Sequence, residues 1–148
     1  MRSASLFTIA SGVLTLMFAP NTRAASTAES AFDGTWWVTV NAPDYKNPDG
    51  KVSLAWMKHF PAKVKNGVLH GELGTRHAPD WYVLDGKIEA NGAANLRANG
   101  ITSDPEHAEH HVRFGTPWEY QVNAHFNGRR GTGNSVGPRP RIFTFTKE

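Results

Sequence analysis

The chain has 148 residues, a formal net charge of +3, 11% aromatic residues and no cysteine. Two of its basic residues, Arg2 and Arg23, lie in the first 24 residues, and the remainder carries 14 basic against 13 acidic residues. This near balance excludes the concentrated positive surface of a nucleic-acid-binding protein. The length suits one domain with a single core, which must be stabilised by packing because disulfides are impossible.

Residues 1–24 have the order of a secretory signal peptide. Arg2 supplies a positive start, residues 5–20 are largely apolar, and Thr22 and Ala24 are small residues at the positions that signal peptidase reads. The apolar run is interrupted by polar residues and falls short of the roughly 20 residues of a membrane span. We therefore expect cleavage after Ala24 and a mature protein without a membrane span, located in the periplasm or secreted.

The rest of the chain predicts an all-β fold. Residues 25–31 are small and polar, which is typical of a flexible leader, and residues 32–148 form the expected domain. Short segments rich in β-branched and aromatic residues predict strands. In chain order these segments are 34–40, 52–60, 62–65, 68–73, 81–84, 87–90, 94–101, 118–126 and 142–147.

Several of these segments alternate between apolar and polar residues, as strands with one buried face do. The first predicted strand places Trp36, Val38 and Val40 on one face, and the last places Phe143 and Phe145 on its buried face. Residues 118–126 alternate most regularly; their apolar face comprises Trp118, Tyr120, Val122, Ala124 and Phe126.

Glycine and proline mark the predicted turns. Asn-Gly, the strongest short-range hairpin signal, occurs at Asn66-Gly67, Asn91-Gly92, Asn99-Gly100 and Asn127-Gly128. We expect further turns at Asp85-Gly86 and in the glycine-rich residues 129–137, and a corner or sheet edge at Pro61.

About eight antiparallel strands of this length close naturally into a barrel, which removes exposed sheet edges. The sequence therefore favours a single antiparallel up-and-down β-barrel. A β-sandwich of two sheets is the alternative, because the number of strands alone does not distinguish the two architectures.

Two resemblances support this fold. Gly34-Thr35-Trp36 resembles the Gly-x-Trp opening of the first strand in lipocalins and avidin-like barrels, which implies that Trp36 packs across one end of a barrel. Residues 32–36, 60–71 and 126–133 are similar to segments of small exported proteobacterial proteins of unassigned function. The second resemblance implies a compartment and a fold but no particular activity.

The aromatic residues are the strongest functional signal. Barrel mouths bind ligands through aromatic walls with a few polar groups. The predicted ligand-binding residues are Trp36, Trp56, Trp81, Trp118 and Tyr120, together with Arg129 as a partner for an anionic group. The alternative is that these aromatic side chains only fill the core.

Three histidines, His107, His110 and His111, lie in the polar segment 103–117 among acidic residues. Imidazole and carboxylate are ligands for zinc, copper or nickel. The prolines in this segment indicate a loop without a rigid element to hold a metal, so we expect only weak, adventitious binding and assign no metal or cofactor. The glycine-rich segment after Asn127 lacks the following helix of a phosphate-binding loop.

No residue is assigned a catalytic role, because the serines lie outside nucleophile-elbow contexts. The sequence predicts non-enzymatic binding of a small apolar or aromatic molecule, which requires an apolar cavity larger than roughly 300 Å³. One alternative is a protein-interaction or inhibitor-type envelope factor, which predicts a filled barrel with an exposed apolar patch. The other is a hydrolase of an envelope polymer, which requires two carboxylates facing each other across a groove.

Overall fold

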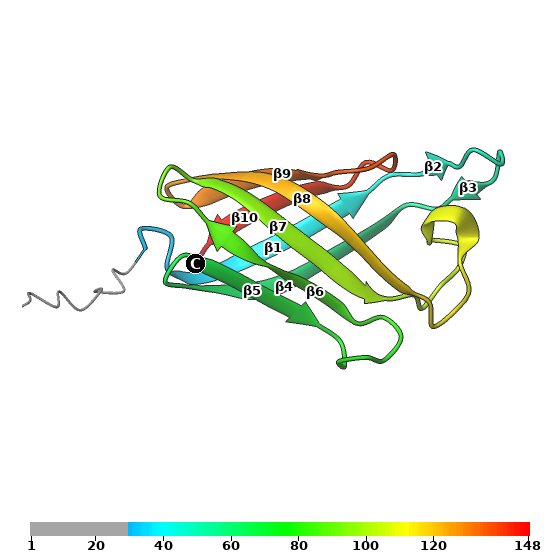
Figure 1. The fold of residues 1–148 in the computed structure, drawn as a ribbon, viewed down its shortest axis with the longest axis horizontal. Helices are drawn as coiled ribbons and strands as arrows, with labels where there is room; N and C mark the ends of the chain where they lie inside the picture. Colours follow the sequence, from blue (N-terminus) through cyan, green and yellow to red (C-terminus); the bar gives the residue numbers. More distant parts are fainter. Residues whose placement is uncertain (1–29) are drawn as a thin grey trace, which may run out of the picture.

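The computed structural model describes residues 30–148, so the predicted signal peptide and nearly all of the predicted leader lie outside the described residues. Eight antiparallel strands form one closed barrel, which confirms the up-and-down architecture (Figure 1). Around the barrel the strands are β1 (Gly34–Ala42), β4 (Trp56–Lys65), β5 (Val68–Leu73), β6 (Tyr82–Ile88), β7 (Ala93–Ile101), β8 (Pro117–Asn127), β9 (Arg130–Ser135) and β10 (Ile142–Lys147).

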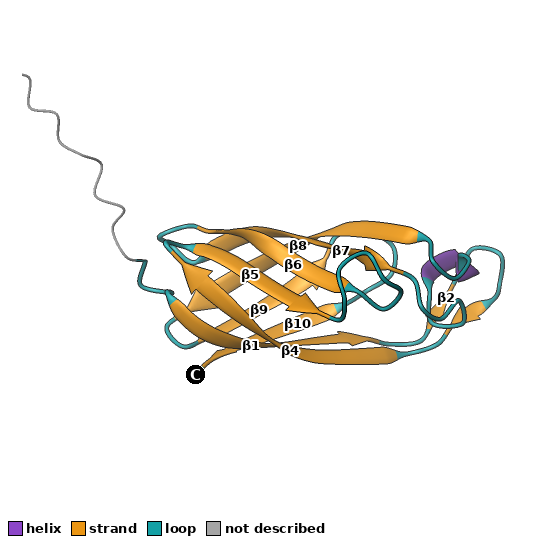
Figure 2. Cartoon of the chain, turned by 90° about the horizontal axis from the view of Figure 1, so that it is seen from below, coloured by secondary structure: helices purple, strands orange, loops and turns teal. Residues whose placement is uncertain are grey.

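The two ends of the barrel differ in their connections. One end, called here the closed end, carries the tight turns at residues 66–67, 89–92 and 128–129. The other end, called here the mouth, carries the long connections 43–55, 74–81, 102–116 and 136–141. A two-stranded ribbon of β2 (Tyr45–Lys46) and β3 (Val52–Ser53) and the short 3₁₀ helix η1 (Glu109–His111) extend beyond the mouth in both views (Figures 1 and 2).

The barrel core has the predicted alternation. Trp36, Val38 and Val40 of β1 are fully buried, as are Phe143 and Phe145 of the neighbouring β10. Because successive side chains of a strand point to opposite faces, alternate residues of each strand fill the interior and the others face solvent.

Among the described residues no helix is long and apolar enough to cross a membrane.

Trp36 fills the closed end. Its indole Nε1 donates a 2.8 Å hydrogen bond to the carbonyl oxygen of Phe32, and its ring meets Phe126 edge-on at 5.2 Å. Asp33 fixes the adjacent turn by accepting hydrogen bonds from the backbone N–H groups of Asn66 (2.8 Å) and Gly67 (3.0 Å). These bonds, that from Gly67 foremost, hold the pKa of the Asp33 carboxyl below its ordinary value.

Three predicted turns are wrong. Asn99-Gly100 lies within β7, Asp85-Gly86 lies within β6, and the glycine-rich segment forms strand β9 instead of a loop. Two of these glycines lie against large rings. At Gly100 a Cβ would come within 2.0 Å of the Trp81 carbonyl oxygen and 2.5 Å of the Trp118 ring, and at Gly131 within 2.9 Å of the Phe126 ring. Glycine at these positions does not form a turn. It leaves room within a strand for interior aromatic side chains.

The predicted corner at Pro61 is wrong, because Pro61 lies inside β4. Its only strand partner is Trp37 of β1 and it has none in β5, so locally it lies at the edge that the sequence predicted. The pairing of β4 with β5 begins one residue later, at Ala62↔Gly71, so the residue without an N–H lies where that ladder stops. The predicted strand 52–60 is interrupted: Val52 belongs to β3, Leu54 is exposed, and β4 begins only at Trp56.

Candidate functional site

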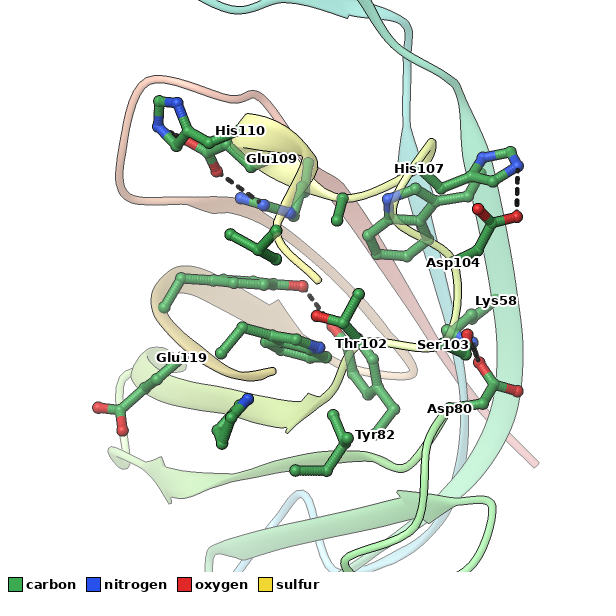
Figure 3. A pocket seen from close by; sticks show the side chains of 18 of the residues that line it. Lys58, Asp80, Tyr82, Thr102, Ser103, Asp104, His107, Glu109, His110 and Glu119 are labelled. Atoms are coloured by element: carbon green, nitrogen blue, oxygen red, sulfur yellow. Dashed lines mark hydrogen bonds and ion pairs between the residues drawn. The ribbon is translucent and has the colours of Figure 1, made fainter. Parts of the chain in front are cut away.

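A cavity of about 510 Å³ lies at the mouth of the barrel (Figure 3). Its aromatic wall comes from four strand residues on the inner face: Trp56 of β4, Tyr82 of β6, and Trp118 and Tyr120 of β8. The connection 102–116, called here the cover loop, contributes residues to the opposite side. The barrel is therefore packed at the closed end and hollow at the mouth.

The aromatic wall is continuous. The rings of Trp118 and Tyr120 stack at 5.3 Å and 15°, Tyr82 lies 5.1 Å from Trp118, and Trp56 meets Tyr82 edge-on at 6.3 Å. Their positions follow from the pairing of β7 with β8, in which Gly100 stands opposite Trp118 and Ala98 opposite Tyr120. Small residues on one strand leave room for large rings on the next.

Buried polar groups meet this wall at Tyr120. The hydroxyl oxygens of Tyr82 and Tyr120 are 2.6 Å apart, and the guanidinium of Arg141 lies 4.1 Å from the centre of the Tyr120 ring. Burial raises the pKa of Tyr120 to about 12 and that of Tyr82 well above its ordinary value, so both hydroxyls remain protonated at neutral pH. Arg141 also forms a 3.0 Å ion pair with Glu109 of the cover loop.

A second arginine attaches the cover loop to the barrel. Arg139 is fully buried and donates hydrogen bonds to the carbonyl oxygens of His107 (2.6 Å), Leu54 (2.8 Å) and Pro43 (3.3 Å). These carbonyls belong to two connections of the mouth, 43–55 and 102–116. The cover loop is therefore held in place by a buried charge at its centre, although the sequence indicated only a polar loop.

Two more side chains hold the cover loop: Asn47 in the β2–β3 connection and Ser53 in β3. Ser53 Oγ donates a 2.7 Å hydrogen bond to the Ala108 carbonyl oxygen, and Asn47 Oδ1 accepts one of 3.0 Å from the His110 backbone N–H. Asn47 and Ser53 are both buried and are joined by a 2.8 Å hydrogen bond.

The three histidines share the cover loop but not a site. His107 Nδ1 lies 3.0 Å from the Ala55 carbonyl oxygen, and His111 Nε2 lies 3.0 Å from that of Val52. His110 is on the other side of the loop from His107, beside Glu109 (Figure 3). Within residues 30–148 no group of three His, Cys, Asp or Glu side chains is placed to hold a metal ion.

Four of the six predicted ligand-binding residues lie around the cavity: Trp56, Trp81, Trp118 and Tyr120. The other two lie at the closed end. Trp36 is fully buried there, and Arg129 is exposed in the β8–β9 turn, where its Nη2 donates a 3.2 Å hydrogen bond to the Lys147 carbonyl oxygen. The structure therefore separates Trp36 and Arg129 from the cavity.

Sequence reasoning missed Tyr82, Glu109, Arg139 and Arg141. A signal for the two arginines was present, because Arg139 and Arg141 have the same parity as the buried Phe143. Extending the inward face of the last strand back across Pro140 places both guanidiniums inside the mouth. Pro138 and Pro140 interrupt this alternation, and proline is more typical of loops than of strands.

The carboxylates at the cavity each have a partner. Asp80 pairs with Lys58 at 2.6 Å, Glu109 pairs with Arg141, and Glu119 pairs with Arg97. Asp104 Oδ1 accepts a 3.0 Å hydrogen bond from the backbone N–H of Glu106. These contacts give the carboxylates structural roles, which weakens the hydrolase alternative.

Comparisons of the chain with protein-family models, with curated proteins and with solved structures found no match. The functional interpretation therefore rests on the geometry of the mouth cavity.

Proposed function

We propose that this protein is a non-enzymatic binding protein that holds a small apolar or aromatic molecule in the mouth cavity. The observation that carries the proposal is a cavity of about 510 Å³ whose wall consists of stacked and tilted aromatic rings. Cavities of roughly 300–1,000 Å³ with mostly apolar walls and a few fixed polar groups are typical of small-molecule sites.

The mouth cavity also favours this function over its competitors. A protein-interaction factor would need a filled barrel and an exposed apolar patch, whereas the large rings at the mouth surround an open space. A glycoside hydrolase would need two carboxylates free to act on a substrate. Asp80, Glu109 and Glu119 are instead ion-paired.

The test is titration of the purified protein with phenylnaphthylamine, a neutral aromatic dye that fluoresces when transferred to an apolar site. We expect saturable binding of one dye molecule per chain. Trp118→Ala removes a wall ring and should weaken binding about tenfold, since it removes both buried apolar area and an aromatic contact. Binding that does not saturate would contradict the proposal.

Trp37→Ala is the matched control, because Trp37 faces outward, is 37% exposed and stacks on His59 at 4.9 Å. The same truncation at this position should leave dye binding unchanged. If Trp118→Ala and Trp37→Ala both bind the dye as the wild type does, the cavity is not the binding site.

We also propose that the protein functions outside the cytoplasm. Arg2, the apolar residues 5–20 and the small residues Thr22 and Ala24 support export with cleavage after Ala24. N-terminal sequencing of the exported protein should begin at Ala25, whereas an intact Met1 in the membrane fraction would contradict the proposal.

Native mass spectrometry of protein purified from its own host would identify a ligand retained in the mouth cavity.

A further inference from the structure

We propose that the ligand of the mouth cavity is an amphipathic acid, whose anionic group binds Arg141 and the Tyr82–Tyr120 hydroxyl pair while its apolar body lies against the aromatic wall. This inference rests on the proposed binding function and adds the chemical class of the ligand. It also assigns Glu109 as an internal competitor, a carboxylate of the protein that occupies Arg141 when no ligand is bound.

The first argument is charge. Arg139 is fully buried and the Arg141 side chain is 9% exposed, yet within residues 30–148 only one carboxylate, that of Glu109, lies within ion-pair distance of either guanidinium. Arg139 donates to backbone carbonyls alone. Burial and the neighbouring charge of Arg141 lower the pKa of Arg139. A positive excess of this kind in a poorly solvated site favours an anionic ligand.

The second argument is unused hydrogen-bond donors. The Nε atoms of Arg139 and Arg141 are buried and have no hydrogen-bond partner among the described residues. In the Tyr82–Tyr120 pair one hydroxyl donates to the other, so the second O–H is still available, and residues 30–148 provide no other partner for it. Arg141 and both tyrosines line the cavity. Arg139 does not line the cavity, so the donors that a ligand can reach belong to Arg141 and the tyrosine pair. Buried donors without partners are costly, and an oxyanion bound there would satisfy them.

The third argument is that Glu109 can leave Arg141 while the cover loop stays in place. A 3.0 Å contact from Arg141 Nη2 to Glu109 Oε2 joins the two side chains. The loop is held independently by Arg139 at His107, by Ser53 at Ala108 and by Asn47 at the backbone N–H of His110. A ligand oxyanion can therefore replace the Glu109 carboxylate as the partner of Arg141 without detaching the loop.

The experiment compares two probes with the same aromatic body. Phenylnaphthylamine is neutral, and anilinonaphthalene sulfonate is the same molecule with an added sulfonate. Both are titrated into the full-length mature protein at one ionic strength. Arg141→Gln should weaken binding of the sulfonate about tenfold or more, since a charge-assisted hydrogen bond is lost, and should leave the affinity for the neutral dye within about twofold.

Glu109→Gln is the decisive variant, because the inference predicts that this variant binds the sulfonate more tightly than the wild type. Removing the competing carboxylate should tighten binding of the sulfonate by about tenfold and leave binding of the neutral dye unchanged. Glu119→Gln is the matched control. Glu119 also lines the cavity, but it pairs with Arg97 and has no contact with Arg141, so the same substitution should have little effect on either probe.

The outcomes separate the two proposals. If neither probe binds, the binding function and the inference both fail. If the neutral dye binds but Arg141→Gln and Glu109→Gln change both probes equally, the binding function stands and the acidic ligand is excluded. If Arg141→Gln does not fold, the Glu109→Gln variant decides alone: unchanged or weaker sulfonate binding overturns the inference, and selectively tighter binding supports it.

Discussion

Trp36 and Trp37 are adjacent in sequence but have opposite environments. Trp36 is fully buried, bonded to the Phe32 carbonyl oxygen and packed on Phe126, whereas Trp37 is 37% exposed on the outer face. Truncation of a buried aromatic residue costs about 3–5 kcal/mol, a large share of the about 5–15 kcal/mol that stabilises a domain. We expect Trp36→Ala to unfold at a much lower urea concentration than Trp37→Ala. Equal midpoints would contradict the assignment of Trp36 to the core.

A second residue-scale prediction concerns Glu72, which accepts hydrogen bonds from Arg76 and from the Trp81 indole (2.8 Å). The bond from Arg76, and then that from Trp81, lowers the pKa of Glu72 from 4.5 to about 2. Because the folded-state pKa lies below the ordinary value, the stabilisation is fully present above pH 4.5 and is lost as the pH falls through about 2.

Glu72→Gln keeps the shape of the side chain and removes its charge. Its unfolding midpoint should therefore lie below that of the wild type at neutral pH and converge with it as the pH approaches about 2. Glu89→Gln serves as the control, because the Glu89 carboxylate is exposed and lies 3.7 Å from Lys87. A difference between Glu72→Gln and wild type that is constant with pH would show that the charge of Glu72 is not responsible.

Among the structural elements, the cover loop is held by more contacts than its polar sequence indicates. Its polar composition indicates a solvated loop, yet Arg139, Ser53 and Asn47 fix its backbone at successive points. The rings of His107 and His111 lie beside separate backbone carbonyls, and that of His110 lies beside Glu109. Tertiary contacts therefore supply the order that local sequence does not.

This arrangement leads to a prediction for metals. Stoichiometric zinc or copper should leave the melting temperature unchanged, because His107 and His111 would have to abandon their carbonyl partners to share an ion. A tight site would stabilise the protein by about 2.7 kcal/mol at a hundredfold excess over the dissociation constant. A shift of several degrees that disappears in a His110→Ala, His111→Ala double variant would contradict this prediction.

At the scale of the whole molecule, strand β10 closes the barrel. Strand β10 joins β1 on one side and β9 on the other, so Thr144 is paired with both Thr39 and Thr132. Pro61, in contrast, is paired with β1 alone. A proline in a strand is tolerated where no partner needs its N–H and is otherwise strongly destabilising.

We therefore expect Thr144→Pro to lower the free energy of unfolding by about 3 kcal/mol or more, measured by urea denaturation. The Thr144 side chain is exposed, so Thr144→Ala separates loss of the side chain from loss of the N–H and should have a much smaller effect. A Thr144→Pro variant with the midpoint of Thr144→Ala would show that β10 is not needed to close the barrel.

The sequence by itself determined the all-β architecture and the parity of its main strands. Trp36, Val38 and Val40 alternate with polar residues, and alternation is a local property that one strand displays without its neighbours. The turns at residues 66–67 and 91–92 are also predicted locally, because each contains an Asn-Gly pair. The failure at Gly100 has a nonlocal cause, because the Trp81 carbonyl oxygen and the Trp118 ring require space there. At Gly131 the space is required by Phe126, its partner across the β8–β9 hairpin.

Only the tertiary structure decided where the site lies and what it contains. Tyr82 and Tyr120 are 38 residues apart, and Arg139 reaches the Pro43 carbonyl 96 residues away. No local pattern encodes such contacts, because barrel closure and strand register place these residues at one end. Of the predicted aromatic residues, Trp56, Trp118 and Tyr120 lie at that mouth on the inner faces of their strands, as strand alternation requires. Trp36 and Arg129 lie at the other end because parity identifies a face of a strand but not its position along the barrel axis.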